Sequence, residues 1–151
     1  MEWEMKRFEE LTTDELYELL RLRVDVFIVE QRCIYGEIDG HDRQALHLIG
    51  TDGGEIAAYC RILPPGERYD EPSIGRVIVK TAWRGNGHAR GLVERAKDII
   101  RGEWGAVPVR LQAQHHLEPF YGSCGFESIS EPYDDEGVPH IDMRMQVSES
   151  L

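Results

Sequence analysis

The sequence predicts a single domain of the mixed α/β class, in which strands and helices alternate along the chain. Two stretches, about 14–29 and from residue 88 onward, carry apolar residues at helical spacing. The shorter apolar or alternating runs around them are typical of strands. The 151 residues contain no internal repeat and no linker-like segment. We therefore expect residues 1–151 to form one domain, with the element order β-α-β-β-β-α-β-α-β.

The N-terminal half is expected to supply four strands and the first long helix. Thr12 and Glu15 match a capping box, so the helix begins there and runs to the neighbourhood of Val29. Asp-Gly-Gly at 52–54 supplies the positive φ angles of a tight hairpin between two strands. The strands expected in this half are residues 2–8, 45–51, 55–63 and 73–79.

The C-terminal half is expected to hold two helices and two strands. From His88 the apolar residues lie on one helical face, and Gly102 is expected to end this helix. Residues 107–114 then predict a strand and residues 116–126 a short helix. Alternation returns over 140–147, which predicts the last strand.

Composition and charge restrict the function classes. The net charge is −11 and the pI is near 4.9, which argues against a nucleic-acid binder, since such a protein needs a basic surface. The charge is compatible with a cationic substrate such as an amine. No apolar run approaches the ~20 residues that span a bilayer. Residues 1–10 are too charged for a signal peptide, so we expect a cytoplasmic protein.

Neither a disulfide framework nor a metal site is predicted. Cys33, Cys60 and Cys124 are odd in number, widely spaced and outside any Cys-x-x-Cys. The histidines show no His-x-x-x-His spacing. A small buried thiol is the expected state of Cys124, and a role as acyl carrier is the less favoured alternative.

Residues 84–91, Arg-Gly-Asn-Gly-His-Ala-Arg-Gly, stand between a predicted strand and a predicted helix. The backbone N–H groups over residues 86–89 are the unpaired donors of the helix's first turn, and with the helix dipole they favour an anion. Gly85 and Gly87 let a ligand approach the backbone closely, and Arg84 adds a planar fork for phosphate oxygens. The segment therefore predicts a phosphate-binding loop.

Three phosphate-binding patterns compete for this segment. A Walker loop needs Gly-Lys followed by Ser or Thr, and the sequence has no such triplet. A dinucleotide fingerprint needs a third glycine that here, as Gly91, comes one residue late, and the segment follows a strand hairpin. The pattern Arg-x-x-Gly-x-Ala matches without adjustment. A plain glycine turn into a helix is the alternative without a ligand.

Residues 84–89, placed between a strand and an amphipathic helix, resemble the acetyl-CoA signature R-x-x-G-x-[GA] of the GNAT (GCN5-related) N-acetyltransferases. FYGSCGF, residues 120–126, is similar to the F-Y-x-x-x-G-F run near the end of many members. LRVDVFIVEQRCIYGEIDGHDRQALHL at 22–48, AAYCRILPPG at 57–66 and PHIDMRM at 139–145 extend the resemblance to the ElaA-like branch over nearly the whole chain. The resemblance leaves the acceptor undefined.

The resemblance implies a strongly twisted mixed sheet flanked by helices, with two splayed parallel strands, here 73–79 and 107–114. It implies acetyl-CoA as co-substrate and no metal, with pantetheine along the edge of the first of these strands and pyrophosphate on the loop. The implied acetyl-CoA-binding residues are Val77, Val79, Arg84, Gly85, Asn86, Gly87, His88 and Ala89. Thr81-Ala82-Trp83 replaces a proline-containing turn of many relatives, a change expected to alter loop stiffness more than the ligand.

The implied activity is transfer of an acetyl group to a primary amine by direct attack in a ternary complex. Tyr121, by its motif position, is expected to stabilise the departing thiolate. A phenol has a pKa of about 10 and a thiol about 8.5, so hydrogen bonding followed by protonation is favoured over full proton transfer. Packing beside Phe120 is the alternative role. The expected partner is a small-molecule or peptide amine, with no nucleic acid and no membrane, and the resemblance allows a homodimer.

The acceptor amine needs a base, and Glu37 together with Asp39 is the favoured candidate. Asp39 and Asp42 are also expected to bind the substrate, because clustered carboxylates in a loop can hold a cation and relay its proton. A solvated acidic loop is the alternative. The remaining candidates for the base are Glu30, His47, His115, His116 and His140.

Two other functions stay open. The front half also resembles acyl-homoserine-lactone synthases, through Arg23/Phe27, Glu37/Asp39/Asp42 and Arg61-Ile62-Leu63-Pro64. Those enzymes are usually longer and lack this form of the loop and of the F-Y segment. A module that binds acyl-CoA as a sensor or scaffold, without catalysis, is the other alternative.

Overall fold

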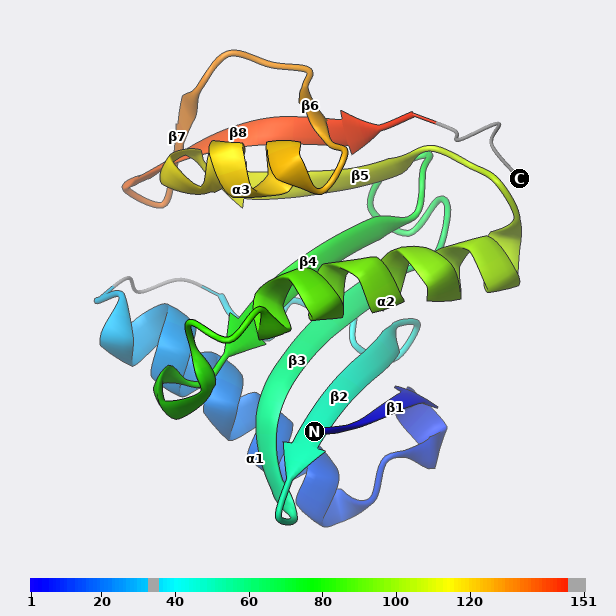
Figure 1. Ribbon diagram of the computed structural model, residues 1–151, viewed down its shortest axis with the longest axis vertical. Helices are drawn as coiled ribbons and strands as arrows, with labels where there is room; N and C mark the ends of the chain where they lie inside the picture. The colour runs from blue at the N-terminus through cyan, green and yellow to red at the C-terminus, as the bar shows by residue number, and fades with distance from the viewer. Residues whose placement is uncertain (33–35, 147–151) are drawn as a thin grey trace.

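The computed structural model describes residues 1–32 and 36–146, which form one mixed sheet with helices on both faces (Figure 1). The strand order is β1-β2-β3-β4-β5-β8-β6, and β7 pairs with β8. The strands are β1 Glu2–Arg7, β2 Leu46–Asp52, β3 Glu55–Leu63, β4 Ser73–Val79, β5 Val109–Gln114, β6 Glu127–Ser128, β7 Tyr133–Asp135 and β8 Val138–Met145. The helices are α1 Thr13–Val24, α2 His88–Trp104 and α3 Glu118–Ser123. The predicted fold class is confirmed, and β6 and β7 are additions too short for a sequence period.

Each face of the sheet carries its own core. On one face, α2 and α3 cover β5 and its neighbours, and Leu92, Leu111 and Met143 are buried there. On the other face, α1 packs Leu19 against residues that include Tyr59. Successive strand residues point to opposite faces, which explains why both sides of the central strands are apolar.

The parallel strands β4 and β5 touch only at their beginning. Their ladder contains one pair, Ser73 with Arg110, and the strands then diverge as Figure 1 shows. The pairing of β3 with β4 shifts register between Tyr59 and Arg61, and Arg76 of β4 has a φ of 53°. A non-glycine residue in this conformation marks a bulge that bends the strand. The expected splay between strands 73–79 and 107–114 is thus confirmed.

Two predicted helix ends differ from the structure. The first helix is α-helical only to Val24 and continues over Asp25–Glu30 as a π-helix, a wider turn that sequence periodicity does not distinguish. The prediction that Gly102 ends the second helix is wrong, because α2 runs on to Trp104. Gly105, with a φ of 82°, provides the left-handed residue that terminates it.

Within the described part of the chain, no helix combines the length and the apolar character needed to cross a membrane.

Candidate active site between the splayed strands

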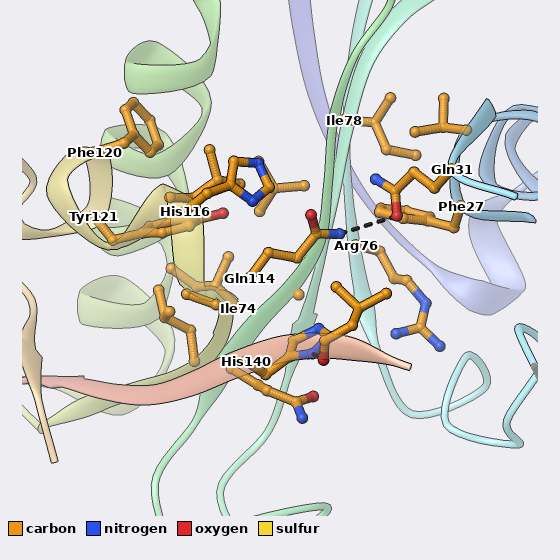
Figure 2. Close-up of a pocket in the computed structure, with 18 of the residues that line it drawn as sticks. Phe27, Gln31, Ile74, Arg76, Ile78, Gln114, His116, Phe120, Tyr121 and His140 are labelled. Carbon is orange, nitrogen blue, oxygen red and sulfur yellow. Dashed lines mark hydrogen bonds between the residues drawn. The ribbon is translucent and has the colours of Figure 1, made fainter. Parts of the chain in front are cut away.

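A cavity of about 560 Å³ lies where β4 and β5 part, and its walls come from both faces of the sheet. Figure 2 shows Phe120 and Tyr121 on the α3 side and Phe27 and Gln31 on the opposite side. Gln114 of β5 lies between them, and its Nε2 donates to Oε1 of Gln31 at 3.0 Å. The splay therefore creates a passage through the sheet rather than a pocket on one surface.

A second cavity of about 280 Å³ lies at the start of α2. It shares Val79, Arg84, Ala89 and Phe120 with the larger one. Because four residues line both, the two cavities adjoin. A long ligand can therefore extend from the helix start into the gap between the strands.

The glycine loop, residues 84–89, forms one wall of the second cavity. Gly85 and Gly87 have φ angles of 84° and 78°, and no side chain caps the helix. The Gly91 N–H makes the first helical bond, to the Gly87 carbonyl at 3.0 Å, and the N–H groups before it have no intrahelical acceptor. Such a helix start favours an anion.

The predicted acetyl-CoA-binding residues of this loop do not all line a cavity. Gly85, Gly87, His88 and Ala89 line the second cavity with Arg84, whereas Asn86 is exposed and outside both linings. The Arg84 Nε donates to the Val79 carbonyl at 2.7 Å, and its guanidinium lies 3.2 Å from the Glu30 carboxylate. Arg84 is thus held against the end of β4 with part of its charge already paired.

Val77 and Val79 line the larger cavity from β4. On one side β4 pairs with β3, but on the other side β5 has already diverged from it. An unpaired strand edge presents backbone N–H and C=O groups that can bond an extended ligand. The geometry places such an edge in the wall of the cavity.

Tyr121 reaches into the cavity from α3 (Figure 2). Its side chain is mostly buried, with the rings of Phe120 and Phe126 edge-on at 5.0 and 6.3 Å. Burial raises the pKa of the Tyr121 hydroxyl above its ordinary value, with smaller contributions from Cys60 and Cys124. The hydroxyl therefore stays protonated and can donate a hydrogen bond.

Glu37 belongs to the acidic loop, residues 36–42, and does not line the cavity. It is only 3% exposed, and its carboxylate accepts from the Nε of Arg23 at 2.6 Å and from the Nε of Arg76 at 2.9 Å. Arg76 separates it from the cavity, whose wall Arg76 forms. Two guanidinium groups thus bind the Glu37 carboxylate within the fold. The base function of Glu37 stays a prediction, and its contacts favour a structural role.

Asp39 and Asp42 complete the same ion-pair network. Asp39 accepts from Arg61 at 2.7 Å, and Asp42 accepts from Arg23 at 2.7 Å and from Arg61 at 3.2 Å. Burial alone would raise both pKa values, but the arginine hydrogen bonds and charges hold the pKa of each aspartate below its ordinary value. Neither residue lines the cavity, so substrate binding by them remains an expectation.

The histidine candidates separate into three groups. His115 lines neither cavity and lies 3.7 Å from the Glu118 carboxylate. His47 is buried in the core, bonded to the Tyr59 hydroxyl at 2.6 Å and to the Asp42 carbonyl at 2.9 Å, and burial lowers its pKa. His116 and His140 line the cavity. His140 Nδ1 lies 2.8 Å from the Val138 carbonyl, which can only accept, so Nδ1 carries the hydrogen. Nε2 is then the ring nitrogen that can accept a proton.

Several cavity residues were not predicted. Gln112 and Gln114 alternate with the buried Leu111 and Ala113 and face the α1 side. Two glutamines that alternate with apolar residues along one strand were the available signal. Arg68, Arg76, Asp135 and Glu136 come from a loop, a bulge and a hairpin, for which no local pattern exists.

The described residues contain no group of three or more His, Cys, Asp or Glu suited to a metal ion. Cys60 and Cys124 are buried free thiols, while Cys33 lies outside the described residues. The Arg90 guanidinium lies 3.8 Å from the Cys124 sulfur.

Comparisons with known proteins agree with this geometry. The family model described as an acetyltransferase (GNAT) domain matches residues 12–147. The chain is 40% identical to protein ElaA of Escherichia coli over 149 residues, which cover 97% of each chain. The ElaA crystal structure superposes with a TM-score of 0.90.

Other solved structures are similar as well. An acyl-CoA N-acyltransferase from Pseudomonas aeruginosa is 41% identical, with a TM-score of 0.91 and coverage of 96% of this chain and 99% of that one. A CoA-dependent acyl-homoserine lactone synthase shares the fold at 15% identity, with a TM-score of 0.80 over 96% of this chain and 82% of the other.

Proposed function

The chain belongs to the GNAT acetyltransferase family, and from that premise we propose that it transfers an acetyl group from acetyl-CoA to a primary amine by direct attack in a ternary complex. The observation that carries the proposal is the junction of the two cavities, which joins an anion-favouring helix start to a buried tyrosine through the gap between β4 and β5. A long thioester with a phosphate-bearing end fits this shape.

The donor set fits coenzyme A. In the proposal the glycine loop holds the pyrophosphate through the N–H groups at the start of α2, and Arg84 lies beside it. The free edge of β4 near Val77 and Val79 bonds the pantetheine amides. These contacts use backbone geometry, so they explain why glycines stand where side chains would obstruct the ligand.

The protein's own groups can then move the protons of the reaction. The amine nitrogen attacks the carbonyl carbon of the thioester, a C–N bond forms and the C–S bond breaks. Nε2 of His140 accepts the proton that the amine loses, and the Tyr121 hydroxyl donates a hydrogen bond to the departing sulfur. The thiolate then takes up a proton from water, and His140 returns its proton to water. The net reaction converts amine and thioester into amide and free thiol, with no proton left over.

Two measurements test this function. Calorimetric titration with acetyl-CoA should show micromolar binding that weakens at least about tenfold in Arg84→Ala, because a charge-assisted contact is lost. Arg101→Ala, which changes an exposed arginine of α2 outside both cavities, is the control. No binding at millimolar acetyl-CoA would refute the proposal.

Turnover separates catalysis from binding alone. Tyr121→Phe should lower amine-dependent thiol release at least about tenfold with little change in acetyl-CoA affinity. Acetyl-CoA binding without thiol release for any amine would instead support the non-catalytic alternative, an acyl-CoA sensor. Unchanged turnover in Tyr121→Phe would remove the tyrosine from the mechanism.

A further inference from the structure

Arg68, in the loop between β3 and β4, is a cation in the cavity wall without a carboxylate partner among the described residues. Within the part of the chain that the structure describes, it donates only to the side-chain oxygen of Gln112, at 3.0 Å. The other arginines in that wall differ, because Arg76 is paired with Glu37 and Arg84 with Glu30. An arginine that faces a cavity with donors to spare is suited to bind an anionic group of a ligand.

The Arg68 guanidinium is held in place by stacking rather than by charge. Its central carbon lies 5.0 Å from the centre of the Tyr69 ring, and Arg110 lies 4.3 Å from the same ring. Arg110 is itself paired with Asp142 at 3.1 Å. Stacking on a ring face leaves the edges of a guanidinium open for a bidentate bond to a carboxylate.

A carboxylate lies on the other side of the same glutamine. The Gln112 Nε2 donates to Asp135 at 2.7 Å, while its Oε1 accepts from Arg68 at 3.0 Å. Asp135 lines the cavity and has no ion-pair partner within residues 1–32 and 36–146. Positive and negative groups thus stand close together on one wall, an arrangement complementary to a zwitterion.

The spacing of Arg68 and Asp135 selects the kind of zwitterion. Both side chains bond to the one amide of Gln112, at 3.0 and 2.7 Å, so the bonded atoms of Arg68 and Asp135 lie no more than about 8 Å apart. Gln112 of β5 pairs with Asp142 of β8, so His140 is its diagonal neighbour on the same face of the sheet. A hydrogen bond spans about 2.9 Å at each end. The amine and carboxylate of an α-amino acid are about 3 Å apart, whereas a lysine ε-amine is about twice as far from its carboxylate or more. The shorter molecule matches the span.

We propose that the acceptor is a free α-amino acid, whose carboxylate binds Arg68 while its amine lies beside Asp135 and His140. The proposal rests on the proposed acetyl transfer and names the substrate class of the same site. It assigns to Arg68 and Gln112 the recognition of the acceptor, on the face of the sheet opposite α2.

The first test compares matched acceptors by thiol release. Each of several amino acids is paired with its decarboxylated amine, such as tyrosine with tyramine, phenylalanine with phenethylamine and histidine with histamine. In at least one pair kcat/KM should favour the amino acid by about 10- to 100-fold, the value of a charged hydrogen-bonded contact. In Arg68→Gln that ratio should fall towards one, while Arg101→Gln should retain it. A ratio near one in the wild-type protein would overturn the proposal.

The second test needs no acetyl-CoA and so separates this inference from the proposed function. Saturation-transfer NMR should detect the preferred amino acid on the wild-type protein and lose it with Arg68→Gln. Amino-acid binding that is unaffected by Arg68→Gln, or the absence of binding by any amino acid, would overturn the assignment. Failure of acetyl-CoA to bind in calorimetry, with amino-acid binding intact, would refute only the acetyl transfer.

Discussion

The glycine loop, residues 84–89, and the acidic loop, residues 36–42, are two polar loops whose polar groups face opposite ways. In the glycine loop the backbone donors at the start of α2 have no intrahelical acceptor and face a cavity. In the acidic loop the carboxylates of Glu37, Asp39 and Asp42 face inward and accept from arginines. The donors of the glycine loop are open to a ligand, whereas the carboxylates of the acidic loop form ion pairs within the fold.

This difference shows how the site is built in two parts. The inward network joins α1, β3 and β4 through Arg23, Arg61 and Arg76 and so fixes the bulge that opens the strands. The glycine loop then needs only an open backbone at the edge of that gap. Changes in the acidic loop should therefore affect stability first, and changes in the glycine loop should affect ligand affinity first.

The largest effect is expected from breaking the inward network at Arg23. Arg23→Met would leave Glu37 and Asp42 as buried charges with one partner fewer, which costs about 3–5 kcal/mol in comparable cases. Urea denaturation measures this loss. Arg21→Met, two residues earlier on the exposed face of α1, should change stability by less than about 0.5 kcal/mol. A loss below about 1 kcal/mol for Arg23→Met would show that the network does not stabilise the fold.

Acid should weaken the same network. Asp39 and Asp42 have folded pKa values below those of the unfolded chain, so their stabilisation is present above about pH 4 and lost as the pH falls below it. Burial lowers the pKa of His47, so its contribution is present above about pH 6.5 and declines below that value. The urea midpoint should therefore fall in two stages between pH 7 and pH 3, and Asp42→Asn should flatten the lower stage. A midpoint constant to pH 3 would contradict this.

A change in the glycine loop should lower ligand affinity more than it lowers stability. In Gly87→Ala the new methyl group meets no atom within 4 Å, but the φ of 78° costs about 1 kcal/mol for a residue with a Cβ. Acetyl-CoA affinity should fall at least about tenfold, because the methyl group and the strained turn both disturb the anion site. Calorimetry and urea denaturation of the same variant separate the two effects. An affinity unchanged by Gly87→Ala would place the pyrophosphate elsewhere.

Local patterns were sufficient for much of the fold. The capping box at Thr12 and Glu15 is present with both of its bonds, because it depends on residues three apart. The bulge at Arg76 could not be predicted, since the partner that holds it, Glu37, is 39 residues away in the chain. The strands β6 and β7 contain two and three residues, too few for a period of two to be recognised.

The glycine loop and the proposed acceptor side also differ in how far the sequence predicts them. Arg84, Gly87 and Ala89 lie within six consecutive residues at a helix start, a local pattern that sequence comparison detects, and the structure places them in the wall of one cavity. Carboxylates have no such local signature, because the same Glu37 can face a substrate or an arginine according to residues distant in sequence. The proposed acceptor side takes Arg68 from the loop between β3 and β4, and Asp135 and His140 from the β7–β8 hairpin, so it combines two segments distant in sequence.

Two glycines at the C-terminal end of α2 offer the smallest and most selective test of backbone geometry. Gly102 lies within the last turn, exposed and with nothing within 4 Å of an added Cβ, so Gly102→Ala should stabilise the protein by about 0.5–1 kcal/mol. Gly105, with a φ of 82°, should lose about 1 kcal/mol in Gly105→Ala, although its surroundings are equally open. Thermal unfolding of both variants gives the sign of each change in stability. Both variants should bind acetyl-CoA normally, because Gly102 and Gly105 lie outside the cavities. Stabilisation by both changes would mean that α2 ends without a left-handed residue, and that open space rather than backbone conformation decides where this chain needs glycine.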